Sequence, residues 1–374
     1  MRQTIQRLRV LVVLVFLGTF IGETMRSRAI QAREAPPPAP GMPVTATPSI
    51  PEISTPSIPP ALPRTRILFT GDINLGRCVA ERAIISEAYT GNYNYPFEFV
   101  AEELRTADIT VGSLDGSLSD ESDPMPCPES MNLIGPARMV EGLQFAGFDV
   151  MTIATNHVKD CGEKGFSCDE KSLLDTVNSL KTVGIQPTGA GNTLFDSRAP
   201  AIVERNGIRF AFLGINQIDP RVWATENTPG TAPLSDAHVE IVKGEINAAR
   251  QIADVVIVLP HWGPEYEINP QDVQRGWAQE FIEAGASLVV GNHPHIIQPM
   301  EVFSDKLVFY SLGNFVFDQE QDYQRESIVV EVNFTGAEIE SWRLHPAKVN
   351  YYTYQAGWAD EIEAGKILAK AVGN

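Results

Sequence analysis

A short stretch decides the fold: residues 67–74, which read ILFTGDIN. The apolar and β-branched run from Ile67 to Thr70 predicts a buried strand, and a polar cluster with Asp72 and Asn74 follows it directly. The same succession of apolar run and polar cluster returns at residues 109–115, 150–157, 255–263 and 288–295. Strands that feed polar loops in this way are typical of layered α/β proteins.

Helical patterns separate these strands, at residues 96–107, 136–146, 170–183, 235–253 and 272–284. Strands that alternate with helices predict a largely parallel sheet. Asn206-Gly207 between two apolar runs predicts a β-hairpin, and a further strand pair is expected at 327–334 and 338–344. We therefore expect a mixed α/β domain over residues 65–350, followed by a C-terminal tail at 351–374.

The polar clusters are expected to meet in space. Loops at the carboxyl ends of strands in an α/β sheet share one crevice, so the clusters would converge there. Four of the six histidines fall in them, whereas chance would scatter the imidazoles along the chain. The residues concerned are Asp72, Asp115, Asn156, His157, His261, His293 and His295.

This set of side chains has the chemistry of a metal centre. Carboxylate and amide oxygens with imidazole nitrogens suit Mn, Fe or Zn. A carboxylate can bridge two such ions about 3.5–4 Å apart, so that a shared water becomes a nucleophile near neutral pH. A single strand-end Asp is more often a helix cap, and a single buried His is usually a core residue. The combination predicts a divalent-metal site with one or two ions.

The order of these motifs resembles the calcineurin-like metallophosphoesterase superfamily and, more narrowly, the CapA family of bacterial capsule (poly-gamma-glutamate) synthesis proteins. The matching motifs are Gly71-Asp72 with Leu75-Gly76-Arg77, Ser113-Leu114-Asp115, Ala154-Thr155-Asn156-His157, Asp160 to Gly162, His261-Trp262-Gly263 with Glu265-Tyr266, His293-Pro294-His295, and Tyr310 to Asp318. They span nearly the whole expected domain. The resemblance implies a metallophosphatase-like αββα sandwich with mixed sheets.

The resemblance also implies roles for single residues. The metal ligands would be Asp72 and His295 at a first ion, Asp115 as the bridge, and Asn156, His261 and His293 at a second ion. His157 would be catalytic, as a proton donor to the leaving group or a stabiliser of the transition state. The superfamily usually has His where Asn74 stands, and the family usually has Glu where Asp115 stands, so a single ion is an open alternative.

A further group of polar residues accompanies the expected ligands: Asn74, Asp160, Glu265, Ser311, Asn314 and Asp318. They could orient the histidines, bind substrate, or cap helices and turns. Trp262 is expected to pack against the metal loop.

The N-terminus has the pattern of an export signal. Arg2, Arg7 and Arg9 precede an apolar run at residues 10–22, which is shorter than the roughly 20 residues of a spanning helix. Residues 1–34 are thus a cleaved export signal or a short membrane anchor, and residues 35–64 form a Pro-rich linker. In either case the folded domain is exported, and either extracellular or membrane-anchored and facing outside the cytoplasm.

Four cysteines, Cys78, Cys127, Cys161 and Cys168, allow three disulfide connectivities. Cys161 and Cys168 are near enough to close a small loop, which would leave Cys78 with Cys127. Structural disulfides are favoured over zinc, because no C-x-x-C spacing is present.

The formal net charge of -18 disfavours nucleic acid as a partner. The resemblance to the CapA family implies a cell-envelope capsule synthesis or export protein with a metal-dependent hydrolase-like site. Its partners would be an anionic polymer or a phosphoester substrate and a membrane-bound capsule synthesis or export complex. Two alternatives stay open: a non-catalytic, metal-dependent polyanion-binding component of that complex, and a secreted phosphoesterase.

Overall fold

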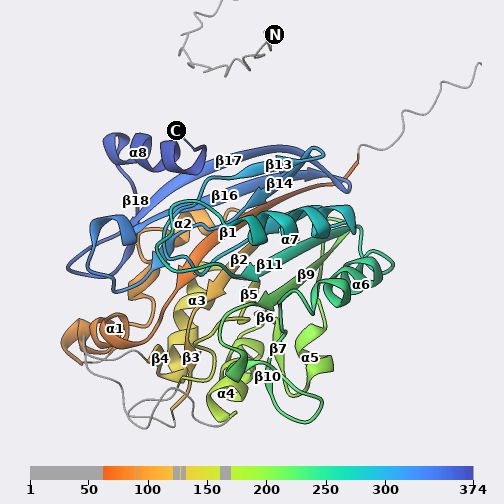
Figure 1. Cartoon of the computed structure of the whole chain (residues 1–374). Coiled ribbons are helices and arrows are strands. Elements are labelled where there is room, and N and C mark those ends of the chain that lie inside the picture. The colour runs from red at the N-terminus through yellow and green to blue at the C-terminus, as the bar shows by residue number, and fades with distance from the viewer. Residues whose placement is uncertain (1–61, 90, 121–126, 128–131, 161–169, 374) are drawn as a thin grey trace, which may run out of the picture. The chain divides into compact units, whose positions relative to one another are not determined.

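The computed structural model describes residues 62–89, 91–120, 127, 132–160 and 170–373 (Figure 1). The predicted export segment and nearly all of the predicted linker lie outside these residues. One compact unit spans Pro60–Asn374. None of the helices in the described part is long and apolar enough to cross a membrane.

The first large sheet has the strand order β18-β17-β16-β1-β2-β5-β6, and β15 pairs with β1 from beside it. Its strands are β1 (Arg64–Ile73), β2 (Ile109–Leu114), β5 (Val150–Thr152), β6 (Gln186–Thr188), β15 (Asn314–Val316), β16 (Glu326–Thr335), β17 (Glu338–Val349) and β18 (Ala356–Trp358). Neighbours from β1 to β6 are parallel, whereas β16, β17 and β18 join in antiparallel fashion. The sheet is therefore mixed.

The second large sheet has the order β13-β14-β12-β11-β9-β8. Its strands are β8 (Ala201–Arg205), β9 (Ile208–Asn216), β11 (Val255–His261), β12 (Leu288–Val290), β13 (Glu301–Phe303) and β14 (Lys306–Phe309). The four central strands are parallel, and the two edge strands pair antiparallel. Two small ribbons add β3 (Ser117–Leu118) with β4 (Ile134–Gly135), and β7 (Ala190–Gly191) with β10 (Gly230–Thr231).

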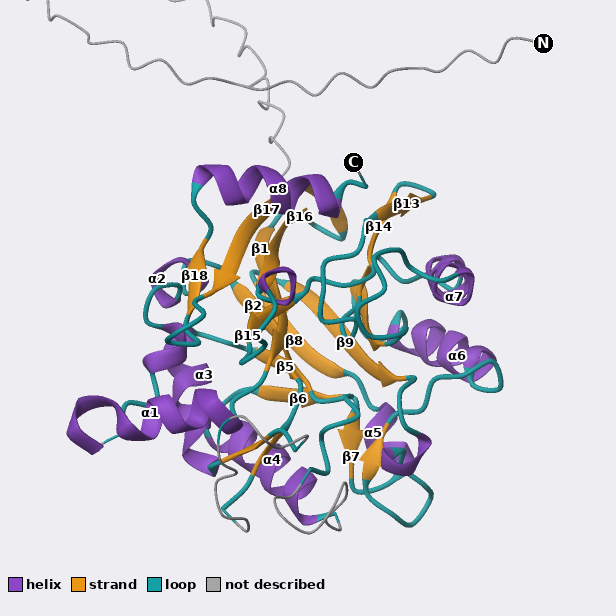
Figure 2. Cartoon of the chain, turned by 60° about the vertical axis from the view of Figure 1, so that its left-hand side comes forward, coloured by secondary structure: helices purple, strands orange, loops and turns teal. Residues whose placement is uncertain are grey.

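Helices cover the outer faces of the two sheets, and Figure 2 shows α1, α3 and α4 on one side of the strands with α6 and α7 on the other. The α-helices are α1 (Arg77–Tyr89), α2 (Ala101–Leu104), α3 (Val140–Ala146), α4 (Lys171–Thr182), α5 (Leu194–Arg198), α6 (Val239–Ala249), α7 (Asp272–Glu283) and α8 (Glu361–Ala371). Short 3-10 helices lie at η1 (Tyr95–Phe97), η2 (Ala137–Met139), η4 (Pro220–Val222) and η5 (Asp322–Gln324).

Alternation along the strands builds the layers. On β1, Ile67 and Phe69 face the core between the sheets, while Leu68 faces the helices. On β9, Phe210 and Phe212 meet the same central core, and Ala211, Leu213 and Ile215 face α6 and α7. A strand buried on both faces needs a nearly continuous apolar run, which is what residues 67–69 supply. The predicted αββα sandwich with mixed sheets is confirmed.

The predicted hairpin is also confirmed, since Asn206 and Gly207 have φ values of 54° and 79° between β8 and β9. The helix expected at 96–107 is wrong in length. The chain there forms only η1 and α2, because the Phe97 carbonyl accepts from Val100 N–H three residues on, a tighter turn than an α-helix makes. Helix α1 had no counterpart among the predicted helices.

The C-terminal segment differs from expectation as well. Residues 351–374 were expected to form a tail, but they contain β18, which pairs with β17, and α8. Ile367 and Ala371 of α8 are fully buried in the core between the sheets. Their burial makes this segment part of the folded domain.

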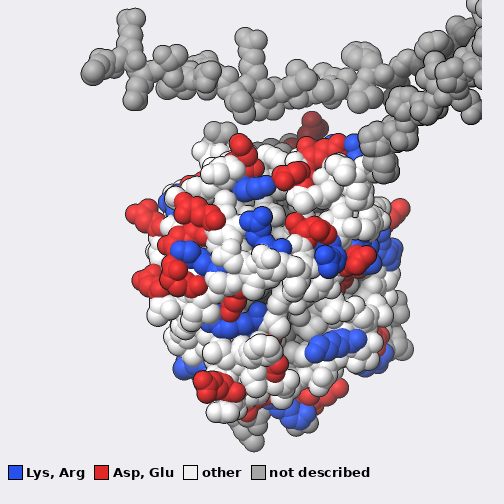
Figure 3. Space-filling model, turned by 90° about the vertical axis from the view of Figure 1, so that its right-hand side faces the viewer, with Lys and Arg blue, Asp and Glu red and all other residues white. Residues whose placement is uncertain are grey.

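Charges of both signs are interspersed on the face drawn in Figure 3, where Lys and Arg side chains lie among Asp and Glu. The acidic balance of the chain therefore forms no continuous acidic field on that face.

Candidate metal centre

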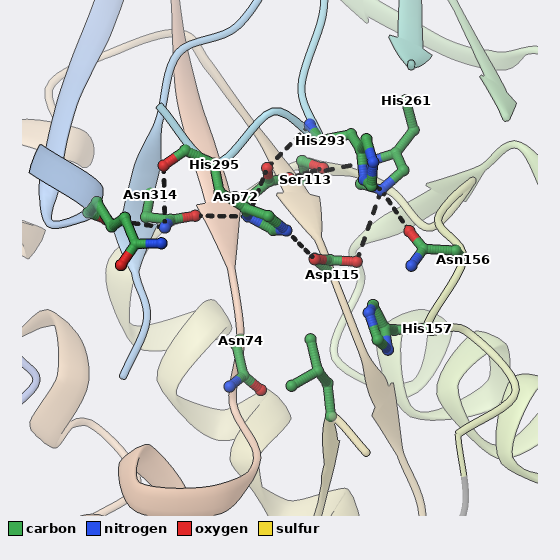
Figure 4. Close-up of polar contacts among 12 residues, drawn as sticks. Asp72, Asn74, Ser113, Asp115, Asn156, His157, His261, His293, His295 and Asn314 are labelled. Carbon is green, nitrogen blue, oxygen red and sulfur yellow. Dashed lines mark hydrogen bonds and ion pairs between the residues drawn. The ribbon is translucent and has the colours of Figure 1, made fainter. Parts of the chain in front are cut away.

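The predicted site residues meet where strands of the two large sheets end (Figure 4). Asp72 lies near the end of β1, Asp115 directly follows β2, and Asn156 and His157 follow β5. From the second sheet, His261 is the last residue of β11, and His293 and His295 lie in the loop after β12. The structure thus brings all seven residues together, although they come from two different sheets.

Asp72 is held from two sides. The Ser113 hydroxyl donates to its Oδ1 at 2.9 Å, and the His293 backbone N–H donates to its Oδ2 at 3.0 Å. Burial and the charge of Asp115 raise the pKa of Asp72 to about 7. A nearby cation would be needed to keep this carboxylate ionised in so buried a position.

Asp115 has the most telling surroundings. Both of its carboxylate oxygens are buried and accept no hydrogen bond from the described residues. Its Oδ1 lies 3.7 Å from His261 Nε2, and its Oδ2 lies 3.6 Å from His295 Nε2. Burial without a partner costs a polar group about 1–3 kcal/mol, and more when the group is charged. The position therefore calls for a cation.

His295 has a fixed orientation. Its Nδ1–H donates to Asn314 Oδ1 at 2.9 Å. The Asn314 amide is itself oriented, because its Nδ2 donates to the Gln324 carbonyl at 2.8 Å and to the His295 carbonyl at 3.3 Å. A neutral imidazole with its proton on Nδ1 presents a lone pair at Nε2. In that form, Nε2 faces Asp115 Oδ2 at 3.6 Å, and a bound cation would satisfy both atoms.

His261 and His293 lie against each other, with His261 Nε2 3.1 Å from His293 Nδ1 and 2.9 Å from Asn156 Oδ1. Burial, reinforced by the charges of neighbouring histidines, lowers the pKa values of both imidazoles. They are therefore neutral at physiological pH, which is the form that binds metal ions.

His157 differs in charge from its neighbours. Its Nδ1–H donates to Asp160 Oδ2 at 2.6 Å, and the same oxygen accepts the Leu133 N–H at 2.7 Å. Burial alone would lower the pKa of His157, but the charges of Asp160 and Asp115 outweigh it and raise the pKa to about 9. A protonated imidazole beside the cluster can give a proton to a leaving group.

The donor chemistry of the cluster fits a divalent cation, and a cation would satisfy the two Asp115 oxygens, which accept no hydrogen bond from the described residues. The described residues nevertheless include no group of three or more His, Cys, Asp or Glu side chains arranged to hold an ion. Instead, the imidazoles contact one another and Asn156 directly. The structure therefore shows the donors together without a ready-made coordination shell.

Asn74 and Asp318 lie apart from the ligands and form a second polar group, as Figure 4 shows for Asn74. The Asn74 Nδ2 donates to Asp318 Oδ1 at 3.2 Å, and its Oδ1 accepts the Gly76 N–H at 2.8 Å. Arg77 donates its Nε–H to Asp318 Oδ2 at 3.0 Å, and the Cys78 N–H donates to the same oxygen at 3.2 Å. Asn74 and Asp318 therefore anchor the start of α1.

The other predicted polar residues have distinct places. Asp160 and Asn314 orient His157 and His295, as described above. The Ser311 hydroxyl receives only a long bond, 3.4 Å, from the Gly313 N–H within its own turn. Glu265 is next to Tyr266, whose pKa is raised by burial and, after it, by the charge of Glu265.

Trp262 is fully buried beneath the site. Its Nε1–H donates to the Tyr310 carbonyl at 2.9 Å, and its ring stacks near those of Phe281 and Tyr310. It fixes the end of β11 and so the position of His261.

Sequence reasoning gave no role to Ser113, although its hydroxyl holds Asp72. The signal was present, because Ser113 lies two residues before Asp115 and pairs in register with Asp72 across parallel β1 and β2. It also missed the aromatic neighbours of His295. The Phe317 and Tyr266 rings lie 5.0 and 6.2 Å from the His295 ring, measured between centroids.

The loops that carry these residues are conformationally strained. His293, His295 and Tyr266 have φ values of 99°, 57° and 63°. Bulky residues rarely adopt positive φ, and such strain concentrates at functional sites.

A disulfide joins Cys78, at the start of α1, to Cys127. This pairing agrees with the one left over when Cys161 and Cys168 are paired, and both of those residues lie outside the described part of the chain.

Comparisons with known proteins point in one direction. The family model described as "Bacterial capsule synthesis protein PGA_cap" matches residues 66–319. The chain is 32% identical over 302 residues to the PGA biosynthesis protein CapA of Bacillus subtilis, covering 80% of this chain and 76% of that one. It is 31% identical to the capsule biosynthesis protein CapA of Bacillus anthracis, covering 70% of this chain and 62% of that one.

Two solved structures are similar in fold. The calcineurin-like phosphoesterase YfkN from Bacillus subtilis is 12% identical with a TM-score of 0.46, covering 77% of this chain and 91% of that one. A putative 5'-nucleotidase from Staphylococcus aureus is 14% identical with a TM-score of 0.46, covering 82% of this chain and 58% of that one.

Proposed function

Because the chain belongs to the bacterial capsule synthesis protein PGA_cap family, we propose that it serves capsule synthesis or export through a metal-dependent hydrolase site at the strand-end cluster. The substrate would be a phosphoester or an amide, such as a bond in an anionic polymer like poly-gamma-glutamate. The observation that carries this proposal is the pair of buried Asp115 oxygens, which accept no hydrogen bond from the part of the chain that the structure describes and which face two imidazoles.

One or two divalent ions held by Asp72, Asp115, Asn156, His261, His293 and His295 would polarise the scissile bond and lower the pKa of an attacking water. Mn, Fe and Zn suit these donors. The family resemblance favours two ions, which Asp115 would help to hold.

The protein's own side chains would orient the metal ligands and protonate the leaving group. His157, protonated at neutral pH and held by Asp160, would neutralise developing negative charge or donate a proton to the leaving group. Asn314 fixes the His295 ring, and Ser113 fixes Asp72, so both ligands are held in position before substrate binds.

Two features favour an exported location, which is part of the same proposal. A disulfide between Cys78 and Cys127 would persist in an oxidising compartment. The basic and apolar N-terminal pattern is typical of export. We propose that the domain acts outside the cytoplasm, either released or tethered by its N-terminus.

The test compares metal content and turnover of simple phosphoesters in the wild type, a His157→Gln variant and a His345→Gln control. His345 lies on β17, and its Nε2 is hydrogen-bonded to Glu331 Oε2 at 3.0 Å. Its replacement therefore leaves the cluster intact. We expect His157→Gln to keep its metal and lose about 10²–10⁴ in kcat, whereas the control keeps both.

A folded protein that binds no divalent metal and hydrolyses no phosphoester or amide would end the enzymatic proposal. A protein that binds metal and polyanion without turnover, and whose His157→Gln variant still supports capsule formation, would instead be a polymer-binding component of an export assembly.

A further inference from the structure

A cavity of about 560 Å³ opens beside the candidate metal centre. Its walls come from the loop after β11, the loop that follows His295, η5 and the end of α8. The side chains that matter most are those of Tyr266, Ile268, Ile296, Ile297 and Tyr323. Its volume falls within the range of roughly 300–1,000 Å³ typical of small-molecule sites.

Tyr266 connects this cavity to the cluster. Its ring lies 6.2 Å from that of His295, so one aromatic side chain belongs both to the cavity wall and to the surroundings of a predicted ligand. Its backbone N–H donates to the Pro294 carbonyl at 2.8 Å, which fixes it in a positive-φ conformation. Ile296 extends the wall directly from His295.

The cavity walls are apolar where the adjoining site is polar. Ile268, Tyr323 and Tyr266 are 68%, 46% and 38% exposed, and all three gather around this hollow. Single exposed apolar residues are ordinary, but their concentration around a cavity marks a binding surface. The charged residues of the lining, Glu326 and Lys370, form an ion pair with each other. They therefore offer little net charge to a ligand.

We propose that this cavity is a substrate subsite for the bulky apolar group of a phosphoester substrate, such as a fused aromatic ring system. In the substrate, about the width of the Tyr266 ring would separate this apolar group from the anionic group that binds at the candidate metal centre. This inference rests on the proposed function for the identity of the reacting group. The tyrosines at 266 and 323 supply ring faces for the apolar group, and the isoleucines supply the floor.

Part of this subsite lies beyond the family match, which ends at residue 319. Tyr323, Glu326, Lys370 and Gly373 all belong to the later segment. The metal cluster lies wholly within the matched residues, so the later segment would add specificity without changing the reacting centre.

The experiment measures binding of two non-hydrolysable probes, 1-naphthylphosphonate and methylphosphonate, to the full chain with Mn²⁺ by titration calorimetry. The variants are Ile268→Asp, Tyr323→Ala and the control Ile362→Asp. Ile362 is 74% exposed near the start of α8 and is matched to Ile268 in type and exposure. Thermal unfolding confirms that each variant is folded.

We expect the wild type to bind 1-naphthylphosphonate about tenfold more tightly than methylphosphonate. Burial of roughly 55 Å² of apolar surface would give this ratio of affinities. Ile268→Asp and Tyr323→Ala should reduce this preference to less than about threefold, whereas Ile362→Asp should keep it.

The outcomes separate this inference from the hydrolase proposal. A preference that the two cavity variants abolish supports the subsite, even if the protein hydrolyses nothing. Equal binding of both probes, absence of binding, or a preference that survives both substitutions overturns the subsite, even if phosphoester turnover is observed.

Discussion

Replacement of Asp115 by Asn should stabilise the metal-free protein, although it removes a predicted ligand. Both carboxylate oxygens are buried without a hydrogen bond from any described residue, and the charge of Asp115 helps to raise the pKa of Asp72 to about 7, after burial itself. An amide at position 115 removes that repulsion. When His295 is neutral, the NH₂ group can also donate to its Nε2, which lies 3.6 Å from the present Oδ2.

The magnitude follows from these two effects. Relief of a buried unsatisfied group is worth about 1–3 kcal/mol, which moves the Tm of a domain of this size by a few degrees. The gain should depend on pH. The pKa of Asp72 is higher in the folded protein than in the unfolded chain. The stability that this shift contributes is therefore present below the unfolded pKa near 4 and is lost as pH rises through about 7. The variant should therefore gain more at pH 8 than at pH 5.

The assay is thermal unfolding in EDTA and in excess Mn²⁺, at both pH values, with Glu338→Gln as the control. Glu338 is an exposed carboxylate paired with Lys306, and its change should leave both unfolding curves alone. The wild type should gain stability from the metal, and Asp115→Asn should lose most of that gain. A variant that is no more stable than the wild type in EDTA at pH 8, or that keeps the full metal response, would refute the reasoning.

Three further outcomes are expected. Asp160→Asn should lower the pKa of His157 from about 9, because the substitution removes a carboxylate charge that outweighs the opposing effect of burial. NMR titration of the His157 imidazole would then show deprotonation at lower pH than in the wild type. Asn314→Ala should weaken Mn²⁺ binding by about 10–100-fold in calorimetry, because His295 loses its orienting partner; unchanged affinity would contradict that role. Glu331→Gln should destabilise the fold at pH 6 but not near pH 2. Hydrogen bonds outweigh burial and lower the pKa of Glu331 to about 2, so the stability that this carboxylate contributes is present above the unfolded pKa near 4.5 and disappears as pH falls through 2. Denaturation at a series of pH values would show this loss.

The strand ends could be predicted because their signals are local. An apolar run followed by Asp, Asn or His marks both the strand and the loop, and parallel pairing brings those loops together. The same reasoning failed for α1, whose apolar residues do not recur at a clear helical spacing, and for residues 96–107, where a 3-10 turn replaces the expected helix. It also failed for α8, because the burial of Ile367 depends on contacts with distant strands.

The apolar cavity had no sequence signal for a related reason. Tyr266, Ile297 and Tyr323 lie on segments far apart along the chain, and each is unremarkable in its own segment. Only the folded arrangement makes them neighbours. The composition predicted a hydrophobic core, and the histidines predicted a metal centre. Neither could indicate which surface beside the metal centre is apolar.

The segment from Tyr310 to Asp318 shows how one motif can organise a site without supplying a ligand. Strand β15 pairs in parallel with β1, which places Asn314 opposite Asp72. Asn314 then fixes the tautomer of His295, and Phe317 packs against the same ring at 5.0 Å. At the end of the segment, Asp318 anchors Arg77 at the start of α1. If a lone pair on His295 must face Asp115 for a cation to bind, the strand that sets this lone pair is as necessary to the centre as the ligands themselves. Loss of metal affinity in Asn314→Ala, with Asp72 and His295 both intact, is the result that this argument requires.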